Sequence, residues 1–390
     1  MAKKKFFLEL LPFLSLFALF VFLHVYQLNS QGFVGDEASP TLLFARFWDA
    51  LRLRDLRYLA YPFLFYHDPF RAVFSGTLLQ LFGASLIILR LPNVIFECFS
   101  FWLLYFTLRR QAVPNLLQLT LLGIFAVSST LMVGRLAGGD GQAKFLFLLT
   151  GILLLQKPSK VTVVCILMSM FTMLDAFVFL PFFLVKCRRD RKIILSVGVI
   201  LTIYFMLWTV LPYLAYVRHF QDYYLNRGFF YYFSRASEGA SSDPLKSLRA
   251  LSHYTSAPFT LTALLSCIFS FFIKPLRKLS FITGTCWLAV LLLSRSSFHV
   301  VMYSNLFFLQ ISYVITYVWQ KHWSLRSGII ALVVLLVGAN LWHFGTHFLS
   351  PINPADEFPD GHIDVMSHGR PTDEAVKRIE EIHGLLEGKD

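Results

Sequence analysis

Residues 6–28 read FFLELLPFLSLFALFVFLHVYQL, an apolar run long enough to cross a membrane as a helix. Composition agrees, because 56% of the 390 residues are hydrophobic, 42 are Phe and only 15% are charged. The sequence therefore predicts an all-α membrane protein with about eleven transmembrane helices. The other ten apolar segments lie at 84–108, 116–133, 145–155, 161–174, 176–185, 193–213, 258–273, 279–293, 300–319 and 327–349. The pair at 161–185 has two alternatives, one kinked segment or a re-entrant hairpin.

The distribution of charge predicts the orientation of the chain. Cytoplasmic loops of membrane proteins carry an excess of Lys and Arg. Basic, acid-poor segments occur at 3–5, 109–110, 157–160, 186–192, 274–278 and 321–326. Most Asp and Glu lie in the alternating segments, at 29–83, 134–144, 214–257 and 350–390. We therefore expect one transmembrane domain over 1–349, with a cytoplasmic N-terminus and a first span that is kept and not removed as a signal peptide. Its external loops at 29–83, 134–144 and 214–257 are expected to form the functional site, and a short external tail follows at 350–390. In a bacterium this is a plasma-membrane protein whose external loops face the periplasm.

The net charge of +12 suits contact with the anionic lipids of a membrane face. No basic segment is interleaved with stacking aromatic residues in a polar domain, so nucleic acid is not an expected partner.

Two adjacent carboxylates, Asp36 and Glu37, follow the first apolar run in the sequence Gly-Phe-Val-Gly-Asp-Glu-Ala at 32–38. Ionisable groups at the mouth of a transmembrane helix commonly face a polar cavity and take part in function. The alternative is a solvated start of a loop, where acids are common.

The order of several short motifs resembles the C-type membrane glycosyltransferases (GT-C fold). The branch that it resembles contains protein O-mannosyltransferases and the lipid A aminoarabinose transferase. The resemblance covers mainly residues 6–147. Its motifs are Gly-Asp-Glu-Ala after the first span, an amphipathic interfacial segment at 41–58, a turn with His67, an apolar stretch ending at Gly83, Arg90-Leu91-Pro92 opening the second span, and Arg135 with Asp140 after the third. The spacing of Arg295, His299 and Tyr303 is a weaker likeness. Pro92 is expected in the first turn of its helix.

The resemblance implies transfer of one sugar from a polyprenyl-phosphate donor to a lipid, glycan or protein acceptor at the outer or lumenal face, with inversion. Asp36 matches the general base of the family, and Glu37 would orient Asp36 or the acceptor, although the two roles could be exchanged. The departing phosphate needs positive partners. The candidates are Arg135, Arg71, Arg295 and His299. A snorkelling interfacial arginine is the alternative for Arg135.

Three further residues are candidates for substrate binding or for support of the site. His67 could bind acceptor, metal or phosphate, or satisfy its own turn. Asp140 could pair with Arg135 and fix its rotamer. Tyr303 lies one helical turn from His299, in a shared cavity or in a packed helix entrance. No cofactor is certain, and a divalent cation remains open.

Other polar residues are given no catalytic role. Arg90 is expected to hold the start of its helix. Glu97 and Asp175 lie within or between spans, so each should face the helix bundle and find a partner there.

Two other functional classes stay open. A lipid or polysaccharide transporter would also be polytopic and basic, but would show internal repeats and charged residues lining several spans, and neither feature is visible in the sequence. A non-catalytic subunit of a glycosylation complex could keep the fold without activity. The intact pair of Asp36 and Glu37 favours an enzyme, although the external tail is too short for the soluble domain that many members of the family carry.

Overall fold

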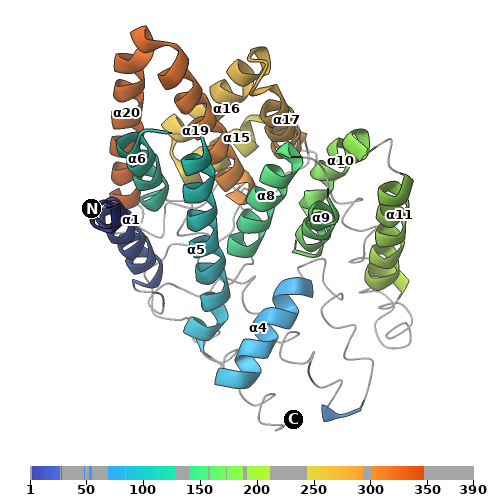
Figure 1. Ribbon diagram of the computed structural model, residues 1–390. Helices are drawn as coiled ribbons and strands as arrows, with labels where there is room; N and C mark the ends of the chain where they lie inside the picture. Colours follow the sequence, from blue (N-terminus) through green and yellow to red (C-terminus); the bar gives the residue numbers. More distant parts are fainter. Residues whose placement is uncertain are drawn as a thin grey trace.

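The computed structural model describes residues 2–26, 28, 48, 52–54, 69–83, 85–111, 113–128, 140–156, 159–172, 174–187, 191–210, 244–292 and 301–346. Within these ranges every regular element is a helix, and no strand occurs (Figure 1). The predicted all-α class is thereby confirmed for the described part of the chain.

The first group of helices comprises α1 (Ala2–Val25), α4 (Pro69–Phe82), α5 (Leu86–Arg110) and α6 (Asn115–Ala126). Helix α4 ends at Gly83, which has φ +83° and donates its N–H to the carbonyl of Leu79 at 2.9 Å. Glycine adopts this left-handed conformation without the steric cost that a Cβ would bring. The chain can therefore turn within a few residues from α4 into α5.

Helix α5 begins at Leu86, six residues before the proline that the sequence predicts in its first turn. The hydroxyl of Ser85 accepts a hydrogen bond from the N–H of Ile88 at 3.2 Å, which caps the first turn. Pro92 therefore lies inside α5 and not in its first turn, and the prediction for this residue was wrong. The N-cap at Ser85, and not the proline, therefore marks the start of α5.

A second group follows, with α8 (Asp140–Leu155), α9 (Lys160–Thr172), the 3-10 helix η2 (Leu174–Phe179), α10 (Leu180–Cys187), α11 (Arg191–Phe205) and the π-helical turn η3 (Met206–Val210). Because η2 separates α9 from α10, the segment 161–185 forms two α-helices and not one continuous helix. Apolar side chains of α9, α10 and α11 line one small pocket between these helices, among them Met170, Phe183 and Val197.

The third group comprises α15 (Pro244–Thr255), α16 (Ala257–Phe272), α17 (Arg277–Leu292), the 3-10 helix η4 (Val301–Tyr303), α19 (Ser304–Lys321), the 3-10 helix η5 (Trp323–Leu325) and α20 (Arg326–Phe344). Helix α15 lies in the segment 214–257, which the sequence predicts as an external loop without a helix. Leu251 of α15 is fully buried and Leu248 packs against the core. The helical spacing of these leucines was therefore a signal that we missed.

Among the described residues, three helical segments are long and apolar enough to cross a membrane, at Ile87–Arg110, Val301–Lys321 and Trp323–His343. Seven shorter apolar helices have 10–17 residues. Each of the eleven predicted segments lies wholly or largely on a described helix. The lengths of the three long helices support a membrane protein. They do not establish the predicted number of about eleven spans.

Aromatic rings and small residues hold the helices together. On one side of the bundle, the rings of Phe13 in α1 and Tyr105 in α5 lie 3.9 Å apart between centroids. Helices α8 and α19 approach closely, since a Cβ built on Gly151 would lie 2.5 Å from Cδ1 of Leu306. A small residue at a helix contact allows this close approach of the backbones.

A buried amide joins three helices of the third group. Gln310 of α19 donates from Nε2 to the carbonyl of Ser266 at 3.3 Å and to the hydroxyl of Ser270, both in α16. Its Oε1 accepts a hydrogen bond of 3.1 Å from Thr283 of α17. These partners satisfy a polar side chain where lipid or packed protein would offer no water.

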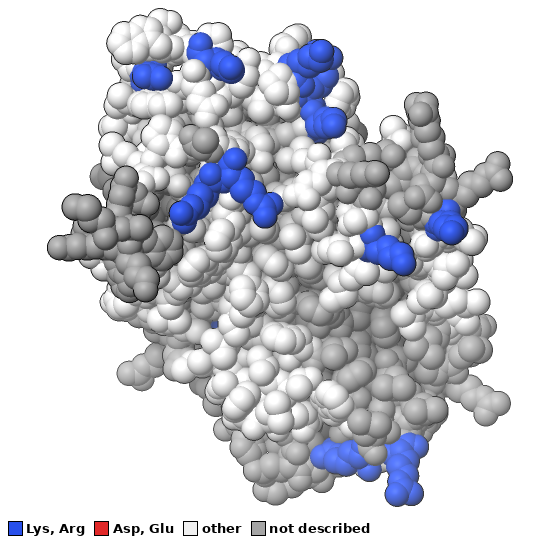
Figure 2. Space-filling model, viewed as in Figure 1, with Lys and Arg blue, Asp and Glu red and all other residues white. Residues whose placement is uncertain are grey.

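Basic residues gather near the ends of the helices. Arg109 and Arg110 close α5, and Lys321 closes α19. The two ends adjoin, because Gln320 donates to the carbonyl of Gln111 at 3.0 Å. Figure 2 shows Lys and Arg over the upper half of the visible face, with a smaller group at its lower end. Among the residues whose side chains the structure describes, Glu97 is the single carboxylate, and it is buried.

Candidate functional site

A buried ion pair joins α5 to α8. The Nζ atom of Lys144 lies 2.6 Å from Oε1 of Glu97, and both side chains have an exposed fraction of 0%. The side-chain amide of Asn305, at the start of α19, donates to Oε2 of Glu97 at 3.3 Å. We refer to Glu97, Lys144 and Asn305 as the charge triad, which ties three helices from different parts of the chain to one point.

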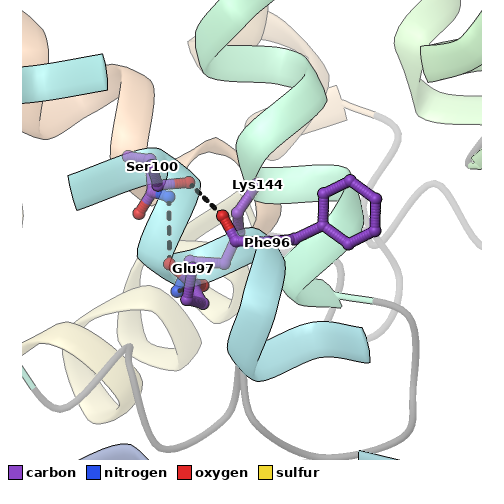
Figure 3. A network of polar contacts seen from close by, with 5 residues as sticks. Phe96, Glu97, Ser100 and Lys144 are labelled. Carbon is purple, nitrogen blue, oxygen red and sulfur yellow. Dashed lines mark hydrogen bonds and ion pairs between the residues drawn. The ribbon is translucent and has the colours of Figure 1, made fainter. Parts of the chain in front are cut away.

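All three side chains of the charge triad are fully buried, and Figure 3 shows Glu97 of α5 beside Lys144 of α8. Glu97 follows Ile87 by about 15 Å along the axis of α5, which places it near the middle of a hydrocarbon layer if that segment crosses the membrane. The hydroxyl of Ser100 donates to the carbonyl of Phe96 at 3.2 Å and so satisfies its own helix. The expectation that Glu97 faces the bundle and finds a partner there is confirmed.

A buried ion pair does not by itself indicate that the two charges stabilise the fold. Removing two charges from water costs several kcal/mol each, and well-packed apolar residues often replace buried pairs without loss. Charged residues inside a membrane domain are rare and commonly mark functional sites. The charge triad is therefore a candidate functional feature, which also fixes the positions of α5, α8 and α19.

A second buried cation fixes the start of α5. Arg90 is fully buried, and its Nη1 donates a hydrogen bond of 2.7 Å to the carbonyl of Leu28, just after α1. A charged donor gives a stronger hydrogen bond than a neutral one. This contact holds the chain eight residues before Asp36 against α5. Its geometry matches the structural role expected for Arg90.

The segments that carry the predicted catalytic and phosphate-binding residues lie mostly outside the described residues. This applies to Asp36, Glu37, His67, Arg135, Arg295 and His299. The backbone of Arg71 lies in the first turn of α4, and Asp140 is the first residue of α8. The side chains of Arg71 and Asp140 are outside the described part, so the contacts of all these candidates lie outside it as well.

Tyr303 is the one predicted site residue whose side chain is described. It has an exposed fraction of 2%. Its ring lies 5.3 Å from that of Phe147 and 6.2 Å from that of Phe307, between centroids. These contacts place the Tyr303 ring among packed aromatic side chains at the start of α19.

Two residues of α8 were not among the candidates predicted from the sequence. Lys144 follows Asp140 by one helical turn, and a lysine inside an apolar run was the available signal. Gln142 is fully buried, and neither Nε2 nor Oε1 has a hydrogen-bond partner among the described residues. A buried amide without partners has a high cost. The start of α8 therefore carries an amide whose donors and acceptor meet no polar group among the described residues.

Metal binding has no support in the described residues, where no group of three or more His, Cys, Asp or Glu side chains is close enough to hold an ion. The acids for which a divalent cation was left open lie outside these residues.

Comparison with known proteins found no match among protein-family models, curated proteins or solved structures.

Proposed function

We propose that the protein is a membrane glycosyltransferase that moves one sugar from a polyprenyl-phosphate donor to a lipid, glycan or protein acceptor. The order of motifs from Asp36 to Asp140 supports this proposal. So does one structural observation: Glu97, within α5, holds Lys144 and Asn305 near the starts of α8 and α19, and Arg90 holds Leu28, which precedes the segment that leads to Asp36. A catalytic constellation needs such rigid supports to hold its geometry.

The chain distances from these fixed points are short. The eight residues from Leu28 to Asp36 span at most about 28 Å when fully extended. Asp140 lies about 6 Å from Lys144 along the axis of α8. Arg295 and His299 precede Asn305 by less than a dozen residues. All three segments can therefore reach one common site beside the start of α8.

The proposed reaction is an in-line displacement at the anomeric carbon. The acceptor oxygen attacks this carbon while its proton passes to the carboxylate of Asp36. The bond from the anomeric carbon to the phosphate oxygen breaks, and the electron pair leaves with the polyprenyl phosphate. Arg135, Arg71, Arg295 and His299 would stabilise the departing charge. Attack opposite to the leaving group inverts the configuration.

The arrangement in the membrane is part of the proposal. About eleven helices would span or enter the bilayer, with the basic ends of α5 and α19 in the cytoplasm. The starts of α8 and α19 would then face outward, on the side of the lipid-linked donor. In bacteria this is the periplasmic side of the plasma membrane.

The proposal is tested by replacing Asp36 with Asn, which keeps the shape but removes the base. Transfer from a short-chain polyprenyl-phosphate sugar should fall by about 10²–10⁴-fold. Asp356→Asn, in the external tail at 350–390, is the matched control and should keep wild-type activity. Mass spectrometry of lipids and glycans in cells with and without the protein would identify the acceptor. Wild-type turnover by the Asp36 variant would reject the assigned base.

A lipid or polysaccharide transporter is the second candidate, and the buried pair of Glu97 and Lys144 favours it, because transporters use charged groups within their spans. The two candidates differ in covalent chemistry. A transporter moves the lipid-linked sugar across vesicles intact, whereas a glycosyltransferase releases polyprenyl phosphate and a glycosylated acceptor.

A further inference from the structure

A cleft opens between α1, α5 and α6, near the end of the bundle where Arg109 and Arg110 lie. The space in it that a water-sized molecule can occupy is about 40 Å³, and the volume counted out to its open, solvent-filled mouth is about 430 Å³. Leu10, Phe13 and Leu119 form its apolar wall. Its polar lining consists of Tyr105, Arg109, Asn115 and Gln118. The cleft is therefore amphipathic and lies far along α5 from the charge triad.

Arg109 is the charged group of this cleft. Its Nη1 donates to the hydroxyl of Tyr105 at 2.9 Å, and its guanidinium carbon lies 5.9 Å from the centre of the same ring. Among the described residues no carboxylate pairs with Arg109, since the ion pair that they contain joins Glu97 to Lys144. A guanidinium has five N–H donors. Most of its donors are therefore available to an anion.

The neighbouring polar groups are held in place. The Tyr105 hydroxyl accepts the bond from Arg109 and keeps its own proton to donate. Gln118 is 5% exposed, and its Nε2 donates to the carbonyl of Tyr105 at 3.1 Å, which joins α6 to α5. At the start of α6, Pro114 makes no side-chain cap, so backbone N–H groups beside Asn115 add to the positive potential.

We propose that this cleft binds the phosphate group of an anionic membrane phospholipid. A guanidinium fork matches a phosphate better than a point charge does, and the Tyr105 hydroxyl can donate a further bond. The apolar wall suits the first part of an acyl chain. Basic pockets between membrane helices are known to hold such headgroups at the cytoplasmic surface. This site is separate from the proposed transferase site.

The test is native mass spectrometry of the full chain in detergent with phosphatidylglycerol, phosphatidylcholine or inorganic phosphate. Wild-type protein should retain one phosphatidylglycerol under conditions that remove phosphatidylcholine. Arg109→Gln should weaken retention about tenfold or more, because it removes a charge-assisted bond. Arg110→Gln is the matched control, since Arg110 is also exposed but does not line the cleft, and it should change retention by less than about twofold.

Two further arms make the result decisive. Arg109→Lys should recover part of the binding, and thermal unfolding should show that all variants remain folded, as expected for an exposed side chain. Unchanged lipid retention by Arg109→Gln, or an equal loss in Arg110→Gln, would overturn the proposed site. Tighter binding of inorganic phosphate than of the phospholipid would overturn the lipid as its ligand.

Discussion

Lys144 of α8 and Glu97 of α5 form an ion pair of 2.6 Å that no solvent reaches. Asn305 adds a neutral hydrogen bond to the same carboxylate, so the charge of Glu97 is balanced by Lys144. In apolar surroundings each charge is tolerable because the other is present. Changing both residues together removes the two charges at once, so the effect of the pair on stability can be measured apart from the effect of an unpaired buried charge.

Lys144→Met should lower the free energy of unfolding by about 3–5 kcal/mol, because it leaves a buried carboxylate without its counter-ion. The double variant Glu97→Leu with Lys144→Met should be more stable than Lys144→Met alone. Thermal unfolding in detergent, followed by size-exclusion chromatography, measures both. Lys278→Met, at an exposed position in α17, is the control and should change little. A double variant that loses the sum of both single effects would contradict this coupling.

Gly151→Ala should be less favourable than Gly123→Ala. Both glycines lie inside helices, where Ala gains about 0.5–1 kcal/mol from helix propensity. A Cβ at Gly123 meets nothing within 4 Å, whereas at Gly151 it lies 2.5 Å from Leu306. The contact of α8 with α19 must shift, which offsets the gain. Thermal unfolding compares the two variants. Equal stabilisation would mean that this contact is loose.

The orientation is tested by labelling single cysteines with an impermeant reagent from outside. A background with the five native cysteines replaced is needed. Cysteines at positions Ser237 and Ser367 should react, whereas those at Ser159 and Ser324 should not, since basic residues surround the latter pair. Permeabilised cells give the control for reactivity. External labelling at Ser159 would reverse the orientation and place the proposed active site on the wrong side.

Arg135→Ala should weaken both binding of the donor and transfer if Arg135 binds the polyprenyl phosphate. Arg135→Lys should recover only part, because a point charge cannot replace a bidentate fork. Titration of purified protein with a short-chain polyprenyl phosphate measures the binding. Loss in Arg71→Ala or Arg295→Ala, with Arg135→Ala unaffected, would move the phosphate site elsewhere. No loss in any of the three variants would favour the transporter.

The sequence predicted the helices better than their contacts. Apolar runs such as 84–108 located α5, because the cost of exposing backbone to lipid leaves few alternatives to a helix. The sequence also indicated that Glu97 needs a partner. It could not name Lys144 or Asn305, since charge complementarity does not specify which distant helices meet. Helix α15 was missed because polar residues surround its few leucines. The candidate acids remain a prediction from motif order.

The charge triad also has a consequence for synthesis of the chain. Its members are made in the order Glu97, Lys144, Asn305, so α5 leaves the ribosome before either partner of its carboxylate exists. At about 5–20 residues per second, Lys144 follows Glu97 after a few seconds, and Asn305 follows later still. During this interval Glu97 enters the membrane without its counter-ion. Nascent chains that stop after α6 should therefore be recognised as incomplete and degraded, whereas chains that include α8 should persist.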